Sequence, residues 1–254
     1  MVRVPVESGR RGLVLDRDWP RRWTVTWRSG GAEVSCPVRE LVQMPWLNGD
    51  PIRGFSWRRD QRHRPGLVFV ASTGRHHGAE SLEEGRVLLA LDFAAGVIDV
   101  VSQPMRLRFD AAKRRAHTPD FLVTARSGTW LIDVRPERLI READLESFAA
   151  AAEVAAACGW GYLVAAGWRE HAWAALDAFS SQRRRLADPL VLRPELLAGA
   201  RSGAVTFGEL AARTRCEPVA RAQLLHLLWR RKLGADLTRP LGDHSRIVGA
   251  GEAA

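Results

Sequence analysis

The sequence is poor in the features on which several common architectures depend. Its three cysteines are far apart and outside any Cys-x-x-Cys spacing, which disfavours both a disulfide framework and a zinc finger. No apolar run approaches the roughly 18 residues needed to cross a bilayer. The first residues also lack the apolar core of a signal peptide. We therefore expect a cytoplasmic globular protein with no membrane partner.

Lysine is almost absent, since Lys113 and Lys232 are the only two among 38 basic side chains. With 29 acidic side chains, the formal net charge is +9. Residues 1–66 carry 13 basic and 7 acidic groups, residues 67–186 carry 15 of each, and residues 187–254 carry 10 and 7. Such basic flanks suit a polyanion, of which DNA is a common example. Solvated arginine-rich faces explain the same composition.

Three regions differ in their patterning. Residues 1–66 form a basic extension with short strand-like pieces such as Trp23–Trp27, and we expect β-hairpins there. This region ends in a basic stretch that serves either as a linker or as a phosphate-contacting arm, and that contains Arg58, Arg59, Arg62 and Arg64. Residues 188–254 predict a short helix from Thr206, a break at Glu217-Pro218, a helix over 219–233 and a β-wing, which is a winged-helix-like order.

The middle region, residues 67–187, predicts one α/β unit. The expected order is helix, three strands, helix, strand, helix. The corresponding segments are Ser81–Phe93, Ile98–Phe109, Thr118–Ala125, Thr129–Val134, Arg141–Cys158, Tyr162–Ala166 and Arg169–Leu186.

Acidic residues gather at the strand ends of this unit. Asp120 opens the second expected strand, and Asp133 lies near the end of the third, on the same face as Arg135. Two carboxylates on neighbouring strands suit Mg²⁺, which uses one or two of them and keeps water on its other positions. Glu84, in the first turn of the preceding helix, is placed to close the same cluster.

Each of these residues also has a purely structural interpretation. Ser81 and Glu84 fit a helix capping box, Asp120 fits a turn, and Asp133 fits an ion pair with Arg135 or Arg106. The same holds outside the cluster. His76, His77 and His117 are predicted as exposed loop residues, and the basic run Arg230, Arg231 and Lys232 either contacts phosphates or is a solvated helix end.

Taken in order, the motifs resemble the PD-(D/E)xK nuclease superfamily. Within it they look like the TnsA-type endonuclease subunits of heteromeric transposases, closest to actinobacterial members. The resemblance covers roughly residues 50–247. It is carried chiefly by the segments Glu80–Glu84, Leu88–Phe93, Ser102–Pro104, His117–Phe121 and Ile132–Pro136.

The resemblance implies an αβββαβ restriction-endonuclease-like core and a DNA endonuclease that depends on Mg²⁺, with Mn²⁺ as a substitute. Glu84, Asp120 and Asp133 would bind the metal, and Arg135 stands where the motif has lysine. The implied partners are DNA, a DDE-type transposase subunit and an AAA+ ATPase regulator. Arginine is always protonated and cannot act as a general base. Two alternatives therefore stay open: a catalytically impaired adaptor that binds DNA, and a free-standing restriction or repair nuclease.

Overall fold

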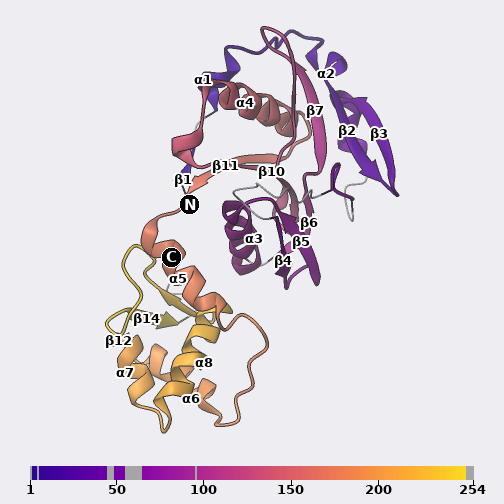
Figure 1. Cartoon of the computed structure of the whole chain (residues 1–254). Helices are drawn as coiled ribbons and strands as arrows, with labels where there is room; N and C mark the ends of the chain where they lie inside the picture. The colour runs from indigo at the N-terminus through magenta and orange to yellow at the C-terminus, as the bar shows by residue number, and fades with distance from the viewer. Residues whose placement is uncertain (1, 5, 45–48, 55–64, 95, 250–254) are drawn as a thin grey trace. The chain divides into compact units, whose positions relative to one another are not determined.

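The computed structural model describes residues 2–4, 6–44, 49–54, 65–94 and 96–249. The fold is mixed α/β and divides into two compact units, Met1–Gly167 and Trp168–Ala254 (Figure 1). The first unit contains the described part of residues 1–66 together with most of the middle region. Helix α5 (Glu170–Ser180) is grouped with the second unit. None of the described helices is long and apolar enough to span a membrane.

A five-stranded sheet organises the first unit. Its strand order is β1-β11-β10-β9-β6, with antiparallel pairing except between β10 and β11, which are parallel. Helix α3 precedes β6, and helix α4 makes the crossover that a parallel pair requires. The bounds are β1 (Val2–Arg3), α3 (Leu82–Ala94), β6 (Val97–Ser102), β9 (Phe121–Ala125), β10 (Gly128–Val134), α4 (Glu142–Ala157) and β11 (Gly161–Gly167).

A second, four-stranded sheet corrects one expectation. The segment Ile98–Phe109 is not one strand but two, because the chain turns at Gln103-Pro104, where Gln103 has φ 48° and Pro104 has no N–H for a ladder. The second half pairs with strands of the N-terminal region instead. The sheet has the order β3 (Ala32–Pro37), β2 (Thr24–Ser29), β7 (Met105–Asp110) and β8 (Arg114–His117).

Helix α4 and the two sheets share one hydrophobic core. Ala150 and Ala151 of α4 are fully buried in the same cluster as Trp23, Phe109 and Leu131, which come from the two sheets or their edges. Small alanine side chains let a helix approach its neighbours closely, so the alanine run of α4 is explained by packing. The basic N-terminal region is therefore part of the fold of the first unit.

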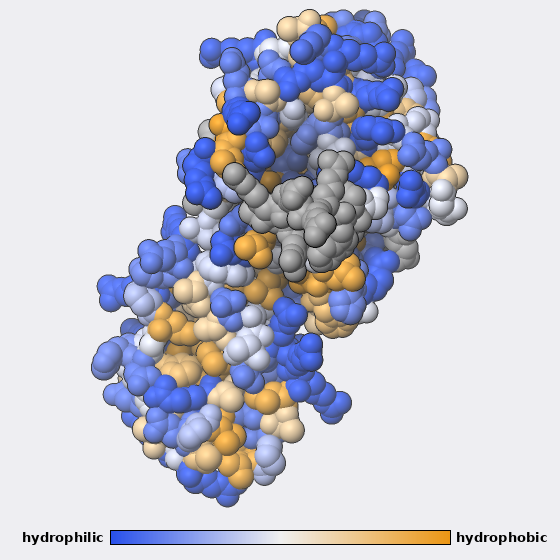
Figure 2. Space-filling view, in the orientation of Figure 1, coloured by the Kyte–Doolittle hydropathy of each residue, from blue (hydrophilic) through white to orange (hydrophobic). Residues whose placement is uncertain are grey.

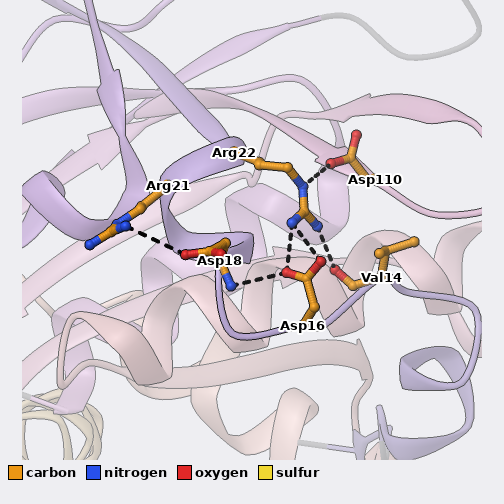
Figure 3. Close-up of polar contacts among 6 residues, drawn as sticks. All are labelled: Val14, Asp16, Asp18, Arg21, Arg22 and Asp110. Atoms are coloured by element: carbon orange, nitrogen blue, oxygen red, sulfur yellow. Dashed lines mark hydrogen bonds and ion pairs between the residues drawn. The ribbon is translucent and has the colours of Figure 1, made fainter.

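A polar network holds the start of the chain against β7 (Figure 3). Arg22 Nη1 donates to both oxygens of Asp16, at 2.6 and 2.7 Å, and Arg22 Nε donates to Asp110 Oδ2 at 3.4 Å. Arg22 Nη2 also reaches the carbonyl of Val14. The hydrogen bond from Arg22 lowers the pKa of Asp16. One guanidinium thus joins the N-terminal segment to the end of a strand.

The histidines of the β4–β5 hairpin correct another expectation. His76 and His77 lie on strand β5 (Arg75–Ala79), which pairs with β4 (Gly66–Val70), and not in a loop. His76 is exposed, as expected, but His77 is not. His77 is only 6% exposed, its Nε2 lies 2.7 Å from Thr73 Oγ1, and burial lowers its pKa. His77 is therefore a residue of the packed interior.

The second unit is a small helical domain with a three-stranded sheet in the order β12-β14-β13. Helix α6 was not expected, because Pro194 and Gly199 interrupt its pattern. Pro218 does not break a helix but stands in the first turn of α8, where proline is favoured. The elements are α6 (Leu192–Arg201), β12 (Val205–Thr206), α7 (Phe207–Ala212), α8 (Glu217–Trp229), β13 (Leu233–Ala235) and β14 (Arg246–Gly249).

Short elements complete the chain. They are α1 (Glu7–Arg10), α2 (Trp19–Arg22), the 3₁₀ helices η1 (Val38–Gln43) and η2 (Glu137–Leu139), and the β4–β5 hairpin. The face shown in Figure 2 is mostly hydrophilic, with apolar residues in smaller groups. The most exposed large apolar side chains are Leu82, Leu67 and Val191, at 74%, 68% and 67%.

Candidate active site

Asp120 and Asp133 face each other at the end of the antiparallel pair β9–β10. The ladder aligns Phe121 with Ile132, and the Asp120 N–H continues it by donating to the Ile132 carbonyl at 3.1 Å. The next residues in the same register are Asp120 and Asp133. Two like charges directly opposite on neighbouring strands destabilise a sheet, so this pair needs a reason beyond the fold.

Asp133 is buried and contacted by two polar side chains. It is 1% exposed, Tyr162 OH donates to its Oδ2 at 2.6 Å, and His117 Nε2 lies 2.9 Å from its Oδ1. The structural interpretation of Asp133 as the partner of Arg135 or Arg106 is therefore wrong. His117 is not an exposed loop residue either, because it ends strand β8 with its side chain 17% exposed.

Asp120 is restrained by one backbone donor, since the Val134 N–H donates to its Oδ2 at 2.6 Å. Burial raises the pKa of Asp120 well above its usual value, and the charges of Asp133 and Glu84 raise it further. The pKa of Tyr162 is also raised, first by burial and then by the charge of Asp133. The three carboxylates thus lie close enough to repel one another.

Glu84 takes part in the capping box that its spacing predicts. Its Oε1 accepts from Ser81 Oγ at 2.8 Å, and Ser81 Oγ accepts from the Glu84 N–H at 3.2 Å. Its Oε2 accepts from the Glu80 N–H at 2.7 Å. Glu84 is 7% exposed, and burial raises its pKa. The helix cap therefore uses the carboxylate of α3 whose charge also raises the pKa of Asp120.

Arg135 has a structural partner in the helix that follows it. Its Nη2 forms an ion pair with Asp144 of α4 at 3.4 Å, and its backbone N–H donates to the Ala165 carbonyl. Its Nε is buried and has no hydrogen-bond partner among the described residues. Part of the positive charge of Arg135 is therefore balanced by Asp144.

Arg53 is a second cation at the site that the sequence motifs did not indicate. Arg53 Nη2 pairs with Glu80 at 2.9 Å, and Arg53 Nε donates to Gln103 Oε1 at 3.1 Å. Gln103 is 1% exposed, and its backbone N–H donates to the Asp120 carbonyl at 2.7 Å. Arg53 also lowers the pKa of Glu84 by its charge. The Arg53 guanidinium is thus linked through Gln103 to the backbone of Asp120.

The donor chemistry fits a hard divalent cation, because three carboxylates offer only oxygen ligands and their mutual repulsion favours one. Among the residues that the structure describes, however, no group of three or more His, Cys, Asp or Glu side chains is arranged to hold a metal ion. The hydrogen bonds explain this arrangement. Both oxygens of Glu84 and Asp133, and one of Asp120, already accept from protein donors.

The basic residues expected to contact DNA fall in two places. Arg58, Arg59, Arg62 and Arg64 lie outside the described residues. Arg230, Arg231 and Lys232 follow helix α8 in the second unit, where Arg231 adopts a left-handed conformation with φ 52°.

The signals for the missed residues are weak in the sequence. Tyr162 is the only tyrosine of the chain, and His117 comes three residues before Asp120. Neither fact predicts that both contact Asp133, because that contact depends on how β8 and β11 are placed beside β10.

Comparison with known proteins adds no further information about this site. No protein-family model matches the chain, and no curated protein is significantly similar to it. The interpretation of the site therefore depends on its own geometry.

Proposed function

We propose that the chain is a divalent-metal-dependent DNA endonuclease, the TnsA-like subunit of a heteromeric transposase, which hydrolyses a phosphodiester at transposon ends. The observation that carries this proposal is the opposition of Asp120 and Asp133, with Glu84 close enough to raise the pKa of Asp120 further. A bound divalent cation relieves this repulsion, which otherwise only costs stability.

The topology supports the same function. Helix α3, strands β6, β9 and β10, helix α4 and strand β11 follow one another in the αβββαβ order of the PD-(D/E)xK core, with β7 and β8 inserted as part of a second sheet. The carboxylates come from the positions that this order predicts: the first turn of α3, the residue before β9, and β10.

In this proposal Glu84, Asp120 and Asp133 hold Mg²⁺ or Mn²⁺. When bound, the ion polarises the scissile phosphate and lowers the pKa of a water ligand. Tyr162 and His117 fix the orientation of Asp133, and the Val134 N–H fixes that of Asp120. These contacts position two ligands on a rigid sheet, which is the arrangement that precise chemistry requires.

Charge on the phosphate is stabilised by arginine. Arg135 contributes only electrostatically, because it stays protonated, and Asp144 offsets part of its charge. Arg53 is better placed than Arg135 to stabilise this charge, because it is hydrogen-bonded to Gln103, which in turn donates to the Asp120 carbonyl. The absence of the motif lysine therefore does not remove positive charge from the site.

A plasmid-nicking assay with Mg²⁺ or Mn²⁺, with and without the cognate transposase, tests the proposal. Asp120→Asn keeps an oxygen for the Val134 N–H but removes the charge, and we expect it to lose about 100-fold or more of the activity. The matched control is Asp110→Asn, a carboxylate of the same unit that pairs with Arg22. Wild-type cutting by Asp120→Asn would refute the proposal, and cutting without any transposase would favour a free-standing nuclease.

An adaptor that binds DNA or protein without cutting is the second candidate. It is favoured by the hydrogen bonds that occupy the carboxylates and by the pairing of Arg135 with Asp144. A transposition assay with Asp133→Asn separates the two functions. Full transposition by a folded Asp133→Asn protein, together with no nicking by the wild type, would establish the adaptor.

A further inference from the structure

A hollow in the second unit is lined by positive charge. It has a volume of about 610 Å³ and is lined by residues of α6, α8, β13 and β14 and of the turn after α8. Four cationic side chains line it, together with His226 and apolar residues, and none of the described residues that line it carries a carboxylate. The four are Arg193, Arg201, Arg230 and Lys232.

Three acidic residues of the unit form ion pairs away from the hollow. Arg221 pairs with Glu217 and Asp243, and Arg239 pairs with Asp236. In the part of the chain that the structure describes, no ion pair joins a carboxylate to any of the four cations of the hollow. Four like charges around one hollow repel one another, which favours an anion between them.

Arg193 is fixed in place by neutral groups. Its Nε donates to Gln223 Oε1 at 2.7 Å, and its Nη2 donates to the Leu186 carbonyl. Gln223 is itself 1% exposed and donates to the Ala187 carbonyl at 2.7 Å. The guanidinium is therefore held rigidly without losing its charge, and little conformational entropy remains to be lost when it binds an anion.

Helix dipoles do not explain this set of charges. Arg201 and Arg230 stand at the C-terminal ends of α6 and α8, where cations are favoured. Arg193, however, lies in the first turn of α6, where a cation is disfavoured. Asp188 caps that turn by accepting from the N–H groups of Leu192 and Arg193.

The turn after α8 brings two of the cations to the hollow in a strained conformation. The Lys232 N–H donates to the Leu227 carbonyl and the Arg231 N–H to the Leu228 carbonyl, which is the bonding pattern of a Schellman motif. Glycine usually occupies the left-handed position of this motif, but here it is Arg231, with φ 52°. Folding alone would favour glycine at position 231, yet the chain has arginine there, within the basic run Arg230 to Lys232.

We infer that this hollow binds a backbone phosphate of DNA. Three of its four cations are arginines, whose forked donors match the oxygens of a phosphodiester. Backbone phosphates recur along a duplex and would supply the anion without any specific sequence. The site lies wholly in the second unit and does not depend on the metal chemistry proposed for the first.

The test measures binding of the full chain to a labelled DNA duplex in EDTA, by fluorescence anisotropy over a series of salt concentrations. Arg201→Gln and Lys232→Gln remove two exposed charges, and we expect the double variant to bind more weakly. Because the hollow binds one phosphate, the salt slope should fall by about one. The control is Arg239→Gln, an exposed arginine of the same unit outside the hollow. It should leave both quantities unchanged.

A second readout comes from His226, whose Nδ1 lies 2.7 Å from the Gln182 carbonyl. Its pKa is lowered by burial and by the charges of Arg193 and Arg230. A phosphate in the hollow should raise that pKa when DNA is added, as measured by NMR. Unchanged DNA affinity and salt slope in the folded double variant would overturn the inference. Tighter binding of an acidic peptide or of inorganic phosphate than of DNA at the hollow would also overturn the inference. Failure of the nicking assay would leave this result intact, because EDTA excludes cutting.

Discussion

Replacing Tyr162 by phenylalanine tests whether the buried carboxylate of Asp133 depends on the hydrogen bond from the Tyr162 hydroxyl. The substitution keeps the ring and removes only the hydroxyl that donates to Asp133 Oδ2 at 2.6 Å. Asp133 is 1% exposed, so water cannot easily replace the lost donor. A hydrogen bond to a charged group contributes about 1.5–3 kcal/mol, and we expect Tyr162→Phe to lower the free energy of unfolding of the first unit by that amount.

Urea unfolding in EDTA, followed by tryptophan fluorescence, measures this loss without interference from bound metal. The slope of the unfolding free energy against urea should stay the same, because the area exposed on unfolding is nearly unchanged. A variant within about 0.5 kcal/mol of the wild type, which is the usual scatter of neutral substitutions, would refute the reasoning. The contact of Tyr162 with Asp133 would then be dispensable.

The pH dependence of the same variant gives an independent check. Burial and the charge of Asp133 raise the pKa of Tyr162, so the folded protein keeps the phenol neutral after the unfolded chain has begun to ionise. The stabilisation from Tyr162 is therefore complete below the ordinary tyrosine pKa of about 10 and is lost as the pH rises toward the folded value. The stability difference between wild type and Tyr162→Phe should shrink over that alkaline range. Because Tyr162 is the only tyrosine, tyrosinate absorbance reports on it alone.

Four further predictions follow from the site and the hollow. Burial, and then the charges of Asp133 and Glu84, raise the pKa of Asp120, so Asp120→Asn should stabilise the metal-free protein more at pH 8 than at pH 5 in urea unfolding. The same variant should abolish the stabilisation of about 2.7 kcal/mol expected at a metal concentration of 100 Kd. Arg53→Gln should reduce nicking about tenfold, a larger loss than Arg135→Gln causes. Ser81→Ala should cost about 1 kcal/mol of stability while strengthening Mn²⁺ binding in calorimetry, since it frees Glu84 Oε1. Arg231→Gly should raise the unfolding free energy of the second unit by about 1 kcal/mol.

Local patterns were sufficient to predict the elements that build the core of the first unit. The helices expected over Ser81–Phe93 and Arg141–Cys158 correspond to α3 and α4, and the strands expected over Thr129–Val134 and Tyr162–Ala166 correspond to β10 and β11. The alanine-rich sequence of α4 favours a helix and the apolar run of β11 favours a buried strand. Gly159, with φ 68°, marks the end of α4. Such signals are contained in the segment itself.

The failures have a different physical origin. Nothing in the local pattern of Ile98–Phe109 shows that the strand changes sheets at Gln103, because both halves carry buried apolar residues typical of a strand. The partners of Asp133 come from β8 and β11, and Arg53 reaches Gln103 across fifty positions of the chain. These contacts depend on tertiary packing, so the sequence predicts the three carboxylates but not the side chains that hold them.

Glu84 shows why the structural and the functional interpretations of such a residue do not exclude each other. Its carboxylate closes the start of α3 by bonding Ser81 and the Glu80 N–H, and the same carboxylate raises the pKa of Asp120 by its charge. In the proposed enzyme, Glu84 must give up part of its hydrogen bonding in the helix cap in order to coordinate the metal ion. Metal affinity is then linked to the stability of the first turn of α3, and any substitution that weakens the cap shifts Glu84 toward the metal. A purely structural cap has no such linkage, so Mn²⁺ affinity in Ser81→Ala distinguishes the two.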